Sequence, residues 1–234
     1  MHAIRIIIPA SSVPLGKKGS GHDFRGTAIS INDPRIPDVV YHVTTNYPAV
    51  MKSGVLLASG RGGLGGDPND RIVSFTIDRK IAEQIKKDLR LAAELAKLDV
   101  PPLGKREEYG ERILKILCER AKEEGWDFSK MADYYRKVGV VLPNYNAMDY
   151  LTQYFTIREE KTGIINPVIY SDIETLRNIN PNNIEIVEVP KEKLNTGALI
   201  TDFDLDNPYG LKEIRVYGDV PIDPPKGHIL SSMQ

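Results

Sequence analysis

The order of the predicted elements is the feature that most constrains this chain: strand-like runs occupy both ends of the sequence, and helical periodicity occupies the middle. The expected strands before the middle are residues 3–8, 39–45, 55–58 and 71–77. The expected helices are a short one at 46–54 and longer ones at 79–98, 105–124, 129–139 and 146–161. The expected later β runs lie within 166–171, 184–190, 198–201 and 211–222. Strands, then helices, then strands are typical of an α+β fold and not of an alternating βαβ series.

We therefore expect a single α+β domain over residues 1–234. Residues 1–38 form an N-terminal strand and an irregular arm rich in Gly, Pro and Ser. Residues 39–85 and 164–222 form a β core, and residues 86–160 form a helical insertion.

Composition narrows the class of protein. A chain of 234 residues with 41% hydrophobic residues can bury a core and fold. The net charge of −1 gives no overall signal for nucleic acid. Cys118 is the one cysteine, which excludes an intrachain disulfide and favours a reducing compartment. With no signal peptide expected in the first ten residues and no apolar run long enough to span a bilayer, we expect a cytoplasmic protein with no membrane partner.

The glycines at Gly60, Gly62 and Gly65 match G-x-G-x-x-G, the letters of a dinucleotide-binding loop. Such a loop joins a strand to a helix, whose N-terminus then holds the pyrophosphate. Here the loop is followed by the β-rich stretch 71–77, and no G-K-[ST] is present. The sequence therefore predicts a hairpin loop, either without a ligand or lying near a ligand that the flanking strands hold.

The flanking strands carry the polar residues that point to chemistry. His42 lies in "YHVTT", and Ser74 and Thr76 lie two apart in "VSFTID", so they share one face of a strand. Glu213 opens the late strand "EIRV". A histidine or glutamate on a strand is more often structural than catalytic, so only the ordered set indicates a site. No group of residues has metal-ligand spacing, and no metal is expected.

In this order the motifs resemble the ADP-ribosyltransferase superfamily, including its bacterial and phage members. The segments that carry the resemblance are 41–45, 51–55, 74–78 with Ala82, and 213–216, followed by the similarity of 166–189 to the segment before the last strands. The resemblance covers residues 39–85 and 164–222, and it leaves the arm and the helical block without a counterpart.

The resemblance implies a pair of split, mainly antiparallel sheets with NAD, the substrate, in the cleft between them. It implies that Glu213 stabilises the positive charge that develops on the ribose as the nicotinamide bond breaks, a problem shared with glycoside hydrolysis. It implies that His42 bonds a ribose hydroxyl and that the backbone of Val43 holds the nicotinamide amide. Thr44 belongs to the same strand motif of the implied NAD site. ADP-ribose would pass to a protein or nucleic-acid acceptor, as in a toxin or a phage-encoded modifier.

The implied pocket is completed by Ser74 and Thr76, which line it and steady Glu213. Glu213→Gln is then expected to abolish turnover and to leave the fold intact.

Two departures from the family pattern leave alternatives open. Ser74-Phe75-Thr76 stands where many members have a pair of tyrosines, so Tyr150 or Tyr154 could stack on nicotinamide or simply belong to the core. Leu211, two residues before Glu213, replaces the acid of arginine-directed members, which argues against an arginine acceptor.

Two other functions remain possible. An RNA 2′-phosphotransferase of the same fold would need Lys52, Arg61 and Arg71 as a phosphate clamp. A non-enzymatic binding module would use the helical block 86–160 to dock a protein partner. His22 and Asp23, in the arm, are a weaker candidate site than a solvated loop.

Overall fold

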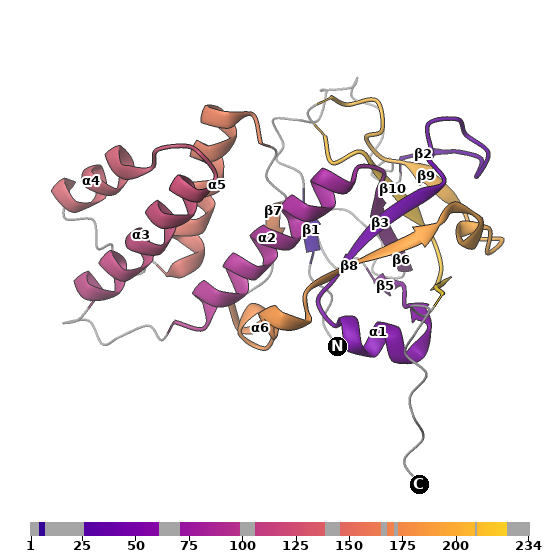
Figure 1. Ribbon diagram of the computed structural model, residues 1–234, viewed down its shortest axis with the longest axis horizontal. Helices are drawn as coiled ribbons and strands as arrows, with labels where there is room; N and C mark the ends of the chain where they lie inside the picture. Colours follow the sequence, from indigo (N-terminus) through magenta and orange to yellow (C-terminus); the bar gives the residue numbers. More distant parts are fainter. Residues whose placement is uncertain are drawn as a thin grey trace, which may run out of the picture.

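The computed structural model describes most of the chain and separates it into two lobes (Figure 1). The described residues are 5–7, 26–60, 71–98, 106–138, 146–164, 168–170, 173–208 and 210–223. The helices are α1 (Tyr47–Ser53), α2 (Arg79–Ala96), α3 (Arg106–Glu123), α4 (Ser129–Val138), α5 (Ala147–Thr162) and α6 (Ile173–Arg177), with 3₁₀ turns at Pro181–Asn183 and Lys191–Leu194. Helices α3, α4 and α5 gather at one end as the helical lobe, the strands gather at the other as the sheet lobe, and α2 runs between them.

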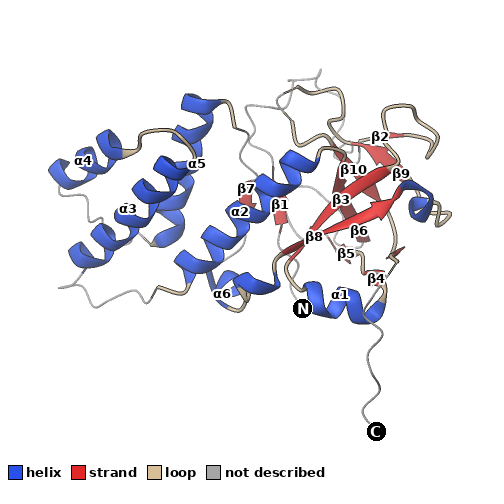
Figure 2. Ribbon diagram, in the orientation of Figure 1, coloured by secondary structure: helices blue, strands red, loops and turns tan. Residues whose placement is uncertain are grey.

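The strands of the described chain pair antiparallel throughout, which confirms the α+β class (Figure 2). The main sheet has the order β2-β9-β10-β6-β3-β8, with β5 also paired to β6. Its strands are β2 (Thr27–Ala28), β3 (Val39–Thr44), β5 (Ser59–Gly60), β6 (Arg71–Thr76), β8 (Glu185–Pro190), β9 (Ile200–Asp202) and β10 (Glu213–Val216). Two small sheets pair β1 (Arg5–Ile7) with β7 (Val168–Tyr170) and β4 (Val55–Leu56) with β11 (Val220–Pro221).

The main sheet is split between β3 and β6. Strand β3 pairs with β8 along its full length, and β6 pairs with β10 over four residues. Between β3 and β6, by contrast, the ladder consists of the single pair Tyr41 and Thr76. The regular ladder between these strands is therefore limited to one pair, and the sheet consists of two halves that are joined by fewer ladder pairs there than within either half.

Local sequence explains the ends of the helices that follow these strands. Asp78 caps α2 by accepting a hydrogen bond from the backbone N–H of Lys80 at 2.9 Å. Gly54 ends α1 in the left-handed region at φ 67°, which glycine adopts at low cost. Asn46 stands at the predicted N-cap of α1, but its side chain makes no cap hydrogen bond.

The described residues form two hydrophobic cores, and α2 contributes to one of them. One core lies between α2 and the helical lobe and also includes Ile184 and Leu211 from the sheet lobe. The other core lies on the far face of the sheet, where Phe75 and Ile214 are buried and α1 covers them. Since α2 is continuous, it runs through the predicted boundary between residues 85 and 86.

An ion pair is enclosed in the core beside α2. Arg158 of α5, which is 0% exposed, donates from both terminal nitrogens to the two carboxylate oxygens of Asp88, at 2.7 and 2.8 Å. Gln84 donates to the same carboxylate, and the Tyr154 hydroxyl donates to Glu124 at 3.0 Å. Tyr154 is thus a core residue of the helical lobe.

Candidate functional site

Polar side chains of β6 and β10 share one face of the sheet. The register places Glu213 opposite Thr76 and Arg215 opposite Ser74. Because alternate residues of a strand point to one face, these four side chains lie together. Phe75, which lies between Ser74 and Thr76 on β6, faces the apolar core on the other side of the sheet. The register therefore brings Ser74, Thr76 and Glu213 to one face of the sheet.

Glu213 is buried and held by two donors. The residue is 6% exposed, and Oε1 accepts hydrogen bonds from Ser74 Oγ and from Arg215 Nε, each at 2.7 Å. The contact with Ser74 matches the predicted role of that serine in steadying the glutamate.

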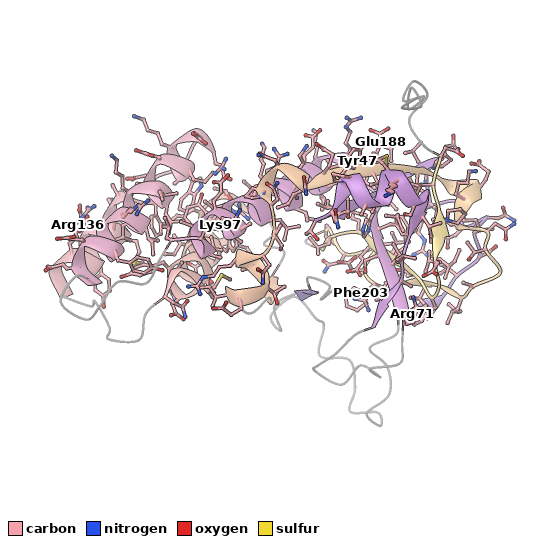
Figure 3. The ribbon with its side chains drawn as sticks, turned by 90° about the horizontal axis from the view of Figure 1, so that it is seen from below. Tyr47, Arg71, Lys97, Arg136, Glu188 and Phe203 are labelled. Carbon is pink, nitrogen blue, oxygen red and sulfur yellow. The ribbon has the colours of Figure 1, made fainter. Side chains whose placement is uncertain are left out.

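Arg215 is a residue of the site that sequence reasoning missed. It is 2% exposed, and its guanidinium carbon lies 3.2 Å from the ring centroid of Phe203. Figure 3 shows Phe203 at the sheet end of the molecule, far from Lys97 and Arg136 at the helical end. The arrangement is a cation held between a carboxylate and an aromatic face. The sequence does contain one signal for it: an arginine two residues after a strand glutamate shares its face.

His42 reaches the same serine from the other half of the sheet. Its Nδ1 lies 2.8 Å from the carbonyl oxygen of Ser74, and since a carbonyl accepts, Nδ1 must donate. Burial lowers the pKa of His42, which favours the neutral ring with an acceptor lone pair on Nε2. Ser74 therefore contacts His42 through its backbone and Glu213 through its hydroxyl.

The placement of His42 depends on the split in the sheet. Counting along the strands from the Tyr41–Thr76 pair, Val43 belongs to the face of Ser74, and His42 belongs to the face of Phe75. The imidazole packs near Phe75, with ring centroids 5.8 Å apart, and bonds the Ser74 carbonyl where the ladder has ended. His42 thus bridges the two halves of the sheet instead of pointing directly at Glu213.

The other predicted site residues have structural contacts. The Thr44 hydroxyl accepts from the backbone of Asn46 in the turn before α1. The Thr76 hydroxyl donates to the Leu211 carbonyl at 2.7 Å and accepts from the backbone of Asp78. The Val43 side chain packs against the helical core. The structure therefore groups Thr76 with Glu213 and leaves Thr44 in a turn.

A turn built on Asp204 sets the start of β10. The Asp204 carboxylate accepts from the backbone N–H groups of Leu211 and Glu213. Burial raises the pKa of this carboxyl to about 6. Lys212, just before Glu213, has φ 50°, a left-handed conformation that strains a residue with a side chain. Backbone strain directly before a candidate catalytic residue is a recurrent feature of functional sites.

The glycine loop connects two strands, as its sequence predicts. Gly60 of β5 pairs with Arg71 of β6, and the next element after the loop is β6 and not a helix. A dinucleotide fingerprint is therefore excluded at this position. Gly62 and Gly65 lie outside the described residues.

The remaining candidates do not join the site. Tyr150 is 3% exposed in the helical core, like Tyr154, and neither lies on the sheet. Arg71 donates to the Ala58 carbonyl and pairs with Asp219, and Lys52 lies on α1. Three weaker candidates lie outside the described residues: His22 and Asp23 in the arm, and Arg61 in the glycine loop.

The partly buried thiol of Cys118 lies in the helical lobe, where burial raises its pKa and so disfavours the reactive thiolate.

Across the described ranges, the search for metal ligands finds no group of three His, Cys, Asp or Glu residues. None of the helices within those ranges is long and apolar enough to cross a membrane. Comparison with protein-family models, with curated proteins and with solved structures gives no match.

Proposed function

We propose that this protein is an NAD-dependent ADP-ribosyltransferase, which breaks the bond between nicotinamide and ribose and transfers ADP-ribose to a macromolecule. One observation carries the proposal: His42 and Glu213, 171 residues apart in the printed sequence, both contact Ser74 at the point where the sheet splits. The antiparallel order of the sheet supports an ADP-ribosyltransferase type of fold.

The chemistry of the residues fits such a substrate. Breaking the nicotinamide bond makes the ribose carbon positive, and the Glu213 carboxylate would stabilise that charge. Neutral His42, with Nδ1 bound to Ser74, would accept a hydrogen bond from a ribose hydroxyl at Nε2. On the same face, the buried Thr201 hydroxyl has no hydrogen-bond partner, and its residue pairs with Arg215. An orphaned polar atom beside the carboxylate is consistent with a site for a polar ligand.

For the acceptor of ADP-ribose, only its chemical class is proposed. We propose a protein or nucleic-acid acceptor, with the helical block 86–160 as the surface for a protein partner. On that block, Tyr134 of α4 is 56% exposed.

A second candidate function follows from the burial of Glu213 and Arg215. Their side chains are 8% and 3% exposed, similar to the enclosed pair in the helical lobe. A purely structural ion pair would be buried in the same way, and the protein would then be a binding module without enzymatic activity.

The test is release of nicotinamide from NAD by the purified protein. Wild type is expected to release it, and Glu213→Gln is expected to lose about 10²–10³ in rate. Glu188→Gln is the matched control, because Glu188 is a half-exposed glutamate on the neighbouring half of the sheet.

The Glu213→Gln variant can lose activity because it unfolds as well as because it lacks the carboxylate. The sequence alone predicts that this change leaves the fold intact, but it removes the charge partner of buried Arg215, which destabilises the protein. Glu213→Gln with Arg215→Gln removes both charges and separates activity from folding. A well-folded wild type that releases no nicotinamide would support the binding module instead.

A further inference from the structure

The guanidinium of Arg215 contacts two groups at once. Its Nε donates to Oε1 of Glu213 at 2.7 Å, and its planar face lies over the ring of Phe203. The stack on Phe203 fixes the plane of the guanidinium, and that plane sets the direction of the Nε–H bond.

The Glu213 carboxylate is oriented by this contact together with Ser74. Both donors bind the same oxygen, so the carboxylate cannot turn about its last bond without losing both hydrogen bonds. The segment that carries Phe203 also holds the backbone of Glu213, because Asp204 accepts from the Glu213 N–H. The segment around Phe203 and Asp204 therefore positions Glu213 in two ways: it holds the backbone directly, and it holds the side chain through Arg215.

We propose that Arg215, held in place by Phe203, is a positioning residue that aims the Glu213 carboxylate at the ribose during the reaction. This inference rests on the proposed function. Misplacing a catalytic group by about 1 Å can cost about 10²-fold in rate, so a fixed carboxylate is a direct gain in kcat.

Three substitutions at one position separate positioning from charge. Glutamine places its side-chain nitrogen at the same distance along the chain as Nε of arginine, so Arg215→Gln keeps the N–H donor and loses the charge. Arg215→Met loses both at similar length. Arg215→Lys keeps the charge and has no nitrogen at the Nε position.

The experiment measures kcat and KM for nicotinamide release from NAD by wild type and these variants. Positioning predicts that Arg215→Gln retains kcat to within about 10-fold, because a neutral donor is about half as strong as a charged one. Arg215→Met and Arg215→Lys are expected to lose about 10²-fold in kcat, with KM for NAD unchanged.

The outcomes are distinct. Equal losses in all three variants, or a lysine variant more active than the glutamine variant, overturn the positioning role while leaving the proposed function in place. An inactive wild type overturns the proposed function, and this inference with it.

A second pair of variants tests the same role if changes at Arg215 prevent folding. Phe203 is only partly buried, so Phe203→Leu and Phe203→Tyr are both expected to fold. Phe203→Tyr keeps the ring face and is expected to keep kcat. Phe203→Leu is expected to lower kcat by about 2- to 5-fold, the change that a weak cation–π contact represents, with KM unchanged. Equal kcat for the two variants overturns the proposal.

Discussion

The molecule contains two buried arginine–carboxylate pairs, and they differ in how the carboxylate is used. In the helical lobe, Arg158 binds both oxygens of Asp88, which is the closed, bidentate arrangement of a structural pair. In the sheet lobe, Arg215 and Ser74 both bind one oxygen of Glu213. The first geometry maximises contact between the partners, whereas the second fixes the direction of a carboxylate. The difference teaches that burial alone does not distinguish structural from functional charge.

The largest expected effect comes from breaking the ion pair between Arg158 and Asp88. Asp88→Ala leaves Arg158 buried without a counter-charge and is expected to lower the free energy of unfolding by about 3–5 kcal/mol. Glu213→Ala is expected to lower it less, because Arg215 keeps its contact with Phe203. Urea denaturation measures both, with Glu94→Ala on the exposed face of α2 as the control. Equal losses would mean that the two pairs are equivalent.

Removing one donor from Glu213 has the next largest effect. Ser74→Ala deletes a hydrogen bond to a charged group and is expected to cost about 1.5–3 kcal/mol of unfolding free energy. The rate of nicotinamide release should also fall, since the Glu213 carboxylate loses the donor at Ser74 that helps to orient it. Asp88→Ala should not change the rate constant of the molecules that remain folded. Loss of stability with normal kcat in Ser74→Ala would remove this serine from the proposed site.

A pH effect distinguishes the lobes because His42 belongs to the sheet lobe and residues 86–160 contain no histidine. The folded protein lowers the pKa of His42 below its ordinary 6.5, so it favours the neutral ring. The stabilisation is therefore complete above pH 6.5 and is lost as the pH falls below it. His42→Asn keeps an N–H donor for the Ser74 carbonyl but does not titrate. The difference between unfolding free energies at pH 7.5 and pH 5 should be smaller in this variant than in wild type, and an unchanged difference would contradict the assignment.

The smallest expected effect is a gain in the free energy of unfolding. Thr201→Val removes a buried hydroxyl that has no hydrogen-bond partner in the described structure and is expected to raise the unfolding free energy by about 1 kcal/mol. Thermal unfolding of the variant measures this change. If the hydroxyl serves a ligand, NAD should raise the melting temperature of wild type more than that of Thr201→Val. A stabilisation by NAD that is the same in both proteins would exclude Thr201 from the site.

Local patterns in the sequence predicted most of the elements. The apolar spacing of α2 and its cap at Asp78 are short-range signals, and the structure confirms both. The face shared by Ser74 and Thr76 follows from the two-residue period of a strand. These features need no knowledge of distant residues.

What the sequence could not show depends on register between distant segments. Ser74 and Glu213 are 139 residues apart, and only the pairing of β6 with β10 makes them neighbours. Phe203 stacks on Arg215 because the turn around Asp204 folds back on β10; Asn207, Pro208 and Gly210 signal a turn there, but they do not show which side chains the turn brings together. Likewise, His42 bonds the backbone carbonyl of Ser74 beyond the single ladder pair of β3 and β6, and the sequence does not show where that ladder stops.

That single residue pair makes α2 important for holding the sheet together. Helix α2 begins three residues after Thr76, and its residues Arg79 and Lys86 form ion pairs with Glu188 and Glu185 of β8. The helix therefore fastens the half of the sheet with β3 and β8 to the half with β6 and β10, which the ladder joins only at Tyr41 and Thr76.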